Sequence, residues 1–193
     1  MHNARDPGVH AALFPSKSMQ NHLAITAIGP NRIDLVDSFS KAVRDCGCSI
    51  VDSRMSVLGE TCCIMMLLAG SWDAIAKFES MQGRLENRHQ LTMLLRRTEP
   101  RKKERGLMPY AIEVVAVDQI GIVNDISHFF VEREICIEDM YSGTYAAAHT
   151  GTQMFSLHMT ISIPTDHSIA ALRSEFMDFC DHLNLDAIME PVK

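Results

Sequence analysis

The chain has 193 residues, of which 47% are hydrophobic and 22% are charged, and its formal net charge is −6. This balance is typical of globular proteins and excludes general disorder. The negative charge argues against direct nucleic-acid binding, which normally requires a basic face. No apolar run approaches the ~20 residues of a membrane-spanning helix, and the N-terminus lacks a secretory signal, so we expect a cytoplasmic protein without a membrane partner.

Residues 1–20 are predicted to be an N-terminal tail. The first 18 of them carry two prolines and one glycine and show little periodicity, and Met19 stands just before the first strand-like run. They are either native or an extension added upstream of the natural start.

A first structural unit is predicted at residues 21–97. Alternating and helical hydrophobic periodicities give the order strand, helix, strand, strand, helix, strand. Gly47 ends the first helix, and Gly59 with Glu60 forms the tight turn between the two middle strands. The expected elements are strand 22–28, helix 35–46, strands 49–58 and 61–69, helix 72–82 and strand 89–96.

A charged segment follows and is interpreted as a linker at residues 98–109. Basic side chains gather in and just before it, at Arg96, Arg97, Arg101, Lys102, Lys103 and Arg105. A charge run between two apolar blocks is usually a solvated linker, and a docking patch is the alternative.

The same order of elements returns at residues 110–193, so the chain contains an internal repeat. Three pairs of equivalent residues share an offset of 87, namely Asp34 with Gly121, Val36 with Val123, and Asp52 with Asp139. A longer loop at 143–151 distinguishes the second copy. The expected elements are strand 110–117, helix 122–130, strands 135–142 and 153–163, helix 169–183 and strand 185–190.

Each βαββαβ unit predicts an α+β fold of the ferredoxin-like kind, with a four-stranded antiparallel sheet and both helices on one face. The runs IMMLLA (64–69) and FSLHMTISI (155–163) are too apolar for a sheet whose other face meets water. We therefore expect the two sheets to pair, within the chain or with a second chain in a homo-oligomer such as a dimer.

The cysteines and histidines form no recognisable metal or disulfide pattern. Six cysteines occur without a C-x-x-C or zinc spacing, and nine histidines occur without H-E-x-x-H. We interpret the thiols as reduced and buried, and we expect no metal and no cofactor.

The two joins between strand and helix, GPNRIDLV (29–36) and VDQIGIVN (117–124), resemble those of the ACT domain family. Each is followed at a fixed distance by a similar strand, SIVDSRM (49–55) or ICIEDMY (135–141). The usual turn of the family is Asp-Arg-Pro-Gly followed by two aliphatic residues. The first copy keeps Asn and Arg but has Asp34 in place of the glycine, whereas the second copy keeps its aspartate and Gly121.

The resemblance implies that an amino acid binds at these loops. A helix N-terminus presents free amides that suit a carboxylate, and a glycine lets the ligand approach the backbone. Asn124 and Asp139 are candidates for polar contact by analogy with the family, while the charge of Asp34 disfavours a carboxylate in the first copy. The candidate ligand-binding residues are Asn31, Arg32, Asp34, Asp52, Asp118, Gln119, Gly121, Ile122, Asn124 and Asp139.

The sequence favours a regulator over an enzyme. It contains no P-loop and no G-x-S-x-G elbow, and the repeat explains the equivalence of Asp52 and Asp139 without a catalytic pair. The first repeat is also similar to the tandem-ACT repressors of glycine cleavage genes. That similarity implies a response to glycine or a related amino acid and a DNA-binding transcription factor as partner. The alternative is an amino-acid-binding subunit that controls a metabolic enzyme.

Overall fold

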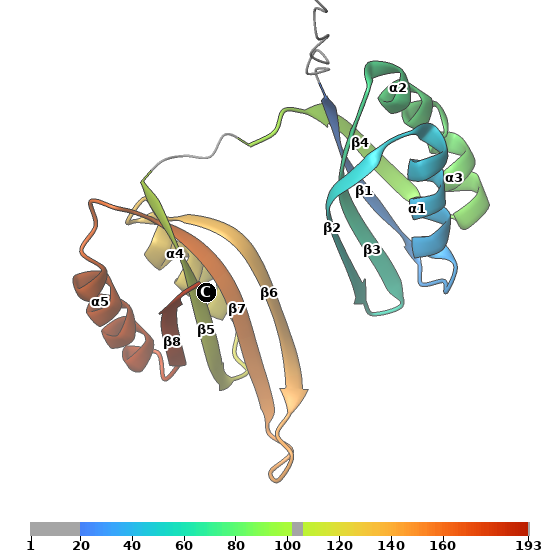
Figure 1. The fold of residues 1–193 in the computed structure, drawn as a ribbon. Helices are drawn as coiled ribbons and strands as arrows, with labels where there is room; N and C mark the ends of the chain where they lie inside the picture. The colour runs from blue at the N-terminus through green and yellow to red at the C-terminus, as the bar shows by residue number, and fades with distance from the viewer. Residues whose placement is uncertain (1–19, 102–105, 193) are drawn as a thin grey trace, which may run out of the picture. The chain divides into compact units, whose positions relative to one another are not determined.

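The computed structural model describes residues 20–101 and 106–192, and these fall into two compact units, one on each side of residues 102–105 (Figure 1). We call them domain 1 and domain 2. The N-terminal tail up to residue 19 and part of the basic cluster, Lys102, Lys103 and Arg105, lie outside the described residues. No helix in the described part of the chain is long and apolar enough to span a membrane.

Domain 1 contains a four-stranded antiparallel sheet of order β2-β3-β1-β4. Its central strands β1 and β3 are therefore joined by the crossover that carries α1 and the edge strand β2. Its elements in chain order are β1 (Asn21–Pro30), α1 (Leu35–Cys46), β2 (Ser49–Leu58), β3 (Thr61–Gly70), α2 (Trp72–Ser80), α3 (Gln82–His89) and β4 (Thr92–Thr98).

Domain 2 repeats this topology with the order β6-β7-β5-β8. Each domain is thus a ferredoxin-like α+β unit, which confirms the predicted fold class. Its elements are β5 (Leu107–Val117), α4 (Ile122–Val131), β6 (Cys136–Ala146), β7 (Gln153–Pro164), α5 (Ile169–His182) and β8 (Asp186–Pro191).

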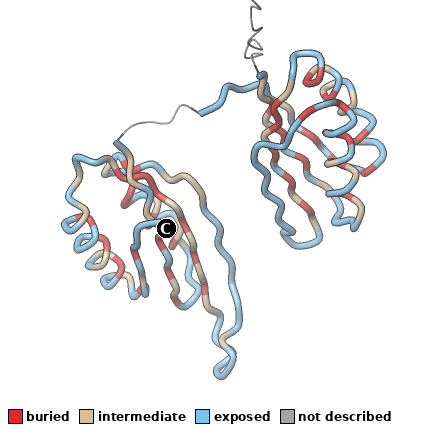
Figure 2. Tube along the Cα trace, viewed as in Figure 1, coloured by how far each residue is buried: buried red, intermediate tan, exposed pale blue. Residues whose placement is uncertain are grey.

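Each domain has its own apolar core between the sheet and the helices, visible as the buried stripes in Figure 2. On β1 every second side chain, Leu23, Ile25 and Ala27, is buried because successive side chains of a strand face opposite sides. Phe39 of α1 packs into the first core, and a group of phenylalanines fills the second. Neighbouring ring centroids in that group, those of Phe129 and Phe130 among them, lie 5.0–5.3 Å apart.

The second helix of each repeat begins at the same capping residue. The hydroxyl oxygen of Ser71 accepts a hydrogen bond from the amide of Ala74 at 3.2 Å, and that of Ser168 accepts one from Ala171 at 3.4 Å. Such a cap satisfies one of the amides that the first turn leaves without a partner. The chain thus starts both helices by the same local device.

A β-bulge interrupts the first edge strand of each sheet at the same place. The pairing of β2 with β3 shifts between Ile50 and Asp52, and the pairing of β6 with β7 shifts between Ile137 and Asp139. An extra residue at a bulge reverses which face the following side chains take. Asp52 and Asp139 consequently lie opposite Leu67 and Thr160, on the sheet face away from the helices.

The predicted helix 72–82 is wrong as a single element. The chain turns at Met81 and forms a second helix, α3, so His89 lies in a helix and not at the start of the expected strand 89–96. The cause is that residues 83–90 carry one strongly apolar side chain, Leu85, which gives too weak a periodicity to reveal a helix. Strand β4 therefore begins only at Thr92.

Two predicted boundaries around the linker and the long loop also differ. Strand β5 begins at Leu107 and so includes Pro109. The strand tolerates this proline because the ladder between β5 and β8 ends one residue later, at the pair Tyr110 and Pro191. Strand β6 continues through Gly143 to Ala146, so the connection between β6 and β7 is shorter than the expected loop 143–151. A glycine inside a strand suggested a turn, but the ladder with β7 holds it.

All six cysteines are free thiols. Four of them are buried, but Cys63 is only half-buried and Cys136 is exposed, which corrects the expectation that all are buried. Cys136 is exposed because it begins β6, an edge strand.

Candidate functional site

The loop from β5 to α4 is fixed at several points by backbone and side-chain hydrogen bonds. The amide of Asp118 donates to the carbonyl of Gln153 at 2.9 Å, and the Nε2 of Gln119 donates to the carbonyl of Leu183 at 3.4 Å. Gly121 then starts the helix with φ of +105°, a value that side chains with a Cβ rarely adopt. The loop therefore delivers the start of α4 in one defined conformation.

The N-terminus of α4 has the properties of an anion site. No side chain caps its first turn, which contains Ile122 and the exposed Asn124. The amides there carry partial positive charge and point out of the helix end. A carboxylate placed against Gly121 would meet these donors.

Asp125, which is not among the residues predicted from the sequence, adds an acceptor at the same place. A Cβ built on Gly121 would lie 3.5 Å from an oxygen of the Asp125 carboxylate. Amide donors and a carboxylate thus adjoin each other, which matches the two opposite charges of an amino acid. The available signal was an acidic residue in the first turn of the helix after the retained glycine.

In the equivalent loop of domain 1, two charged side chains of the loop pair with each other. Arg32 donates to both carboxylate oxygens of Asp34 at 3.1 and 3.4 Å, and this bond is the main reason why the pKa of Asp34 lies below its ordinary value. The amide of Asn31 donates to the carbonyl of Glu60 at 3.3 Å. An ion pair occupies the position that Gly121 leaves open in domain 2.

A buried histidine lies beside that ion pair. The Nδ1 of His89 is 3.7 Å from the carboxylate of Asp34, the ring is 1% exposed, and neither ring nitrogen has a hydrogen-bond partner. Burial lowers the pKa of His89 more than the Asp34 carboxylate raises it, with small further lowering from Arg88 and Arg32. His89 is therefore held neutral, and its position in α3 was not predictable from the expected strand.

Each loop also presents a fully exposed isoleucine. Ile33 and Ile120 are 106% and 105% exposed, respectively, and they share the offset of 87 residues. Their repetition identifies them as a shared feature of the two loops.

Asp52 and Asp139 lie away from the loops within their own domains. Asp139 pairs with Thr160, which pairs with Ala111, six residues before the end of β5 at Val117. At about 3.3 Å per residue this corresponds to ~20 Å along the sheet. Asp52 lies likewise at the level of Ala24, six residues before Pro30. Neither domain alone brings its strand aspartate and its loop into one site.

The surroundings of the two strand aspartates differ. Asp52 accepts a hydrogen bond from Arg54 at 2.8 Å, and this bond is the main cause of its lowered pKa. Asp139 lines a shallow pocket of about 130 Å³ with Tyr141 and His158, whose rings stack at 4.6 Å. Among residues 20–101 and 106–192 no group of three or more His, Cys, Asp or Glu side chains is arranged to hold a metal ion.

Known proteins are similar to this chain in sequence. A family model of the ACT domain matches residues 21–96. The glycine cleavage system transcriptional repressor of Escherichia coli K12 is 29% identical over 167 residues, which cover 86% of this chain and 88% of that protein. The protein of the same name from Shigella flexneri matches to the same extent.

Solved structures agree with the fold over nearly the whole chain. A crystal structure of a protein assigned as a glycine cleavage system transcriptional repressor aligns with a TM-score of 0.67 at 24% identity, covering 91% of this chain and 99% of that one. A protein from Galdieria sulphuraria aligns with a TM-score of 0.72 at 17% identity, covering 90% of this chain and 99% of that one. At these identities the likeness concerns the fold alone.

Proposed function

We propose that this chain, in which an ACT-domain model matches residues 21–96 and which resembles the glycine cleavage system transcriptional repressor, is an amino-acid-responsive regulator. It acts on the transcription of glycine cleavage genes through a DNA-binding partner protein. The net charge of −6 suits an intermediary that does not itself contact DNA.

The single observation that carries the proposal is the open N-terminus of α4. The ligand carboxylate binds the first-turn amides after Gly121, and the ligand ammonium binds the carboxylate of Asp125. The ligand is glycine or a related amino acid, whose carboxylate approaches the backbone where Gly121 has no side chain. Asp118 and Gln119 of the loop and Ile122 and Asn124 of the first turn adjoin this position.

Domain 1 binds the ligand more weakly or not at all. The ion pair of Arg32 with Asp34 occupies its loop, and Asn31 is held by the turn at Glu60. Asp52 and Asp139 belong to a ligand contact only if another domain supplies the loop, because the register separates them from the loops of their own domains.

Binding at the start of α4 alters the preference between two arrangements of the regulator. A coupling free energy of ~1–3 kcal/mol between ligand and partner is enough to change partner affinity by about 5- to 150-fold. The ligand thus needs only a modest difference in affinity between the two arrangements.

The direct test is a thermal-shift series with each of the twenty amino acids. We expect glycine or a related amino acid to raise the melting temperature of the full chain, because a ligand that binds only the folded state stabilises it. Gly121→Val should reduce the shift more than Asp34→Val, and Asp125→Asn should reduce it without the strain of a new side chain at Gly121. No shift with any amino acid would refute the sensing function.

The transcriptional part has its own test. A reporter under the promoter of the glycine cleavage genes should be more active when this chain is deleted, and the effect should depend on added glycine. Complementation with Gly121→Val should restore protein level but not the glycine response. An unchanged reporter in the deletion strain would refute the transcriptional role while leaving ligand binding open to the thermal test.

A further inference from the structure

A groove of about 540 Å³ runs between α4 and α5 on the helix side of domain 2. Its floor is aromatic and aliphatic, formed by Phe129, Phe179 and Leu183. The rings of Phe129 and Phe179 lie 5.0 Å apart, and Phe179 and Leu183 are only half-buried. Apolar surface therefore remains accessible between the two helices.

The rim of the groove is acidic. Four carboxylates surround the floor, from Asp125, Glu132, Glu175 and Asp178. Glu175 pairs with Arg133 at 3.1 Å, and Glu132 lies 3.2 Å from the Nε2 of His128. Within the described parts of the chain the carboxylates of Asp125 and Asp178 have no cationic partner. The rim therefore carries more negative than positive charge.

The groove already holds one guanidinium group, that of Arg133. Its central carbon lies 3.7 Å from the centroid of the Phe129 ring, and one nitrogen donates to the carbonyl of Phe129 at 2.8 Å. A second contact, at 3.1 Å, goes to Glu175. Ring stacking combined with a charged hydrogen bond is a favourable environment for arginine. The same groove suits a further basic side chain next to Asp125 and Asp178.

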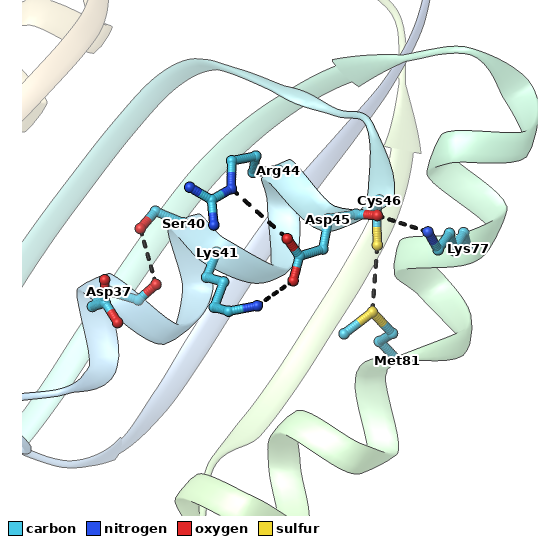
Figure 3. A network of polar contacts seen from close by, with 8 residues as sticks. All are labelled: Asp37, Ser40, Lys41, Arg44, Asp45, Cys46, Lys77 and Met81. Atoms are coloured by element: carbon cyan, nitrogen blue, oxygen red, sulfur yellow. Dashed lines mark hydrogen bonds and ion pairs between the residues drawn. The ribbon is translucent and has the colours of Figure 1, made fainter.

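In domain 1 the corresponding two helices carry the domain's own cations around Asp45 (Figure 3). Lys77 of α2 donates to the carbonyl of Asp45 on α1 at 2.6 Å, while Lys41 and Arg44 lie 2.5 and 3.7 Å from the Asp45 carboxylate. By the offset of 87, the small Ala42 stands where domain 2 has Phe129. The fold itself therefore does not require an acidic aromatic groove.

We propose that the groove between α4 and α5 docks a basic amphipathic helix of a partner protein. Its Lys and Arg side chains lie against the acidic rim, and its apolar stripe lies on Phe179 and Leu183. DNA-binding proteins carry such basic segments because they neutralise phosphates, so occupation of one by this groove withholds it from DNA. The inference rests on the proposed function for the identity of the partner, but not for the chemistry of the groove.

The groove is mechanically linked to the proposed amino-acid site. The same helix, α4, directly follows Gly121 and carries Asp125 and Phe129, and Glu132 caps its end. A ligand that shifts or stiffens the first turn of α4 acts on one wall of the groove. Partner docking and amino-acid binding are thus coupled through a single ten-residue helix.

The test uses the full chain and a fluorescein-labelled synthetic helix with Arg and Lys flanking a leucine stripe. Binding is followed by fluorescence anisotropy without any amino acid present. The groove variant is Glu132→Lys with Asp178→Lys. The control variant is Asp37→Lys with Asp73→Lys. It makes the same change of charge at two exposed positions on α1 and α2 of domain 1.

We expect the dissociation constant to rise by about tenfold or more for the groove variant and to change by less than about twofold for the control. Phe179→Ala, made because that ring is only half-buried, should also weaken binding while the melting curve shows a folded protein. A peptide with Glu in place of Arg and Lys should not bind.

Equal losses in the groove and control variants would overturn the proposal, since they would indicate attraction to overall charge. An unchanged affinity of Phe179→Ala, or no binding by the wild-type chain, would overturn it as well. So would sedimentation showing that the groove is covered by a second copy of the chain, with the copies separating in the groove variant. Failure of the amino-acid thermal shift would refute the sensing function without affecting any of these outcomes.

Discussion

The two domains share a backbone and differ in the surfaces built on it. Both have the same sheet order, the same serine cap on the second helix and the same bulge in the first edge strand. Domain 1 closes its loop with Arg32 and Asp34, whereas domain 2 keeps Gly121 there. Apolar periodicity and caps are thus enough to keep a fold, while the polar positions are free to diverge.

The largest expected difference is in cysteine reactivity, between the exposed thiol of domain 2 and the buried thiols of both domains. Burial raises the pKa of the Cys180 thiol to about 12, so about one molecule in ten thousand carries the thiolate at pH 8. Cys136, on the exposed edge of domain 2, should therefore be alkylated first, and the buried thiols of domain 1 should follow only on unfolding. Peptide mass mapping after timed iodoacetamide treatment checks the order, and early labelling of Cys62 would contradict it.

At the equivalent positions 29 and 116, a methyl side chain should destabilise domain 1 but stabilise domain 2. A Cβ on Gly29 would lie 2.7 Å from both the carbonyl oxygen of Gln90 and the Cδ2 of Leu91, whereas the equivalent residue of domain 2 is the buried Ala116. We expect Gly29→Ala to lower the free energy of unfolding of domain 1 by ~2–3 kcal/mol, because backbone must move. Urea unfolding measures this.

The matched substitution for that comparison is Ala116→Gly. It adds backbone freedom and removes a buried methyl group, so domain 2 should lose about 1–2 kcal/mol without any clash. A Gly29→Ala protein as stable as the wild type would show that strand β1 and the Gln90 turn can separate at little cost.

Acid should weaken domain 1 through His89. Its pKa in the folded state is below the ordinary value of 6.5, so between these two values the unfolded chain binds the extra proton. Stability from this residue is full above pH 6.5 and declines as the pH falls toward the lowered folded pKa. In His89→Leu the decline over that window should be smaller, as unfolding curves at successive pH values would show. A decline as steep as in the wild type would assign it to other groups.

The serine caps should give the smallest effect and the same effect in both domains. Ser71→Ala and Ser168→Ala each remove one acceptor from a helix start, at a cost of ~1 kcal/mol. Denaturant unfolding of each variant measures the loss. A much larger loss for one serine would show that the shared device carries different weight in the two domains.

The sequence predicted the fold class because apolar spacing reports directly on which side of an element is buried. It failed at α3, where Leu85 is the only strong apolar signal in residues 83–90, and at β6, where Gly143 suggested a turn. In both places the stabilising contacts come from the strand that follows, since Glu86 of α3 accepts a hydrogen bond from the amide of Met93 in β4 at 2.8 Å and Gly143 of β6 pairs with Ser156 in β7. Periodicity within the element does not contain these pairings.

The loop residues of the candidate site were predictable, but their spatial relation to the strand aspartates was not. Gly121 stood out because a strand, a glycine and a helix follow each other along the chain. The ~20 Å between that loop and Asp139 depends on the register of β6 against β7 and of β7 against β5, which periodicity does not give. Asp125 and His89 gain their importance from proximity alone.

The matched bulges shift the alternation of side chains between the two sheet faces in β2 and β6 by one residue. Ile50 and Met55 both lie on the helix side although they are five positions apart, an odd spacing that a regular strand does not permit. If Val51 were instead paired as in a regular strand, the next part of β2 would be inverted, with Asp52 and Arg54 on the helix side and Met55 and Val57 on the opposite face. One residue in each repeat thus decides that an aspartate meets solvent and that the hydrophobic alternation remains consistent on both sides of the break.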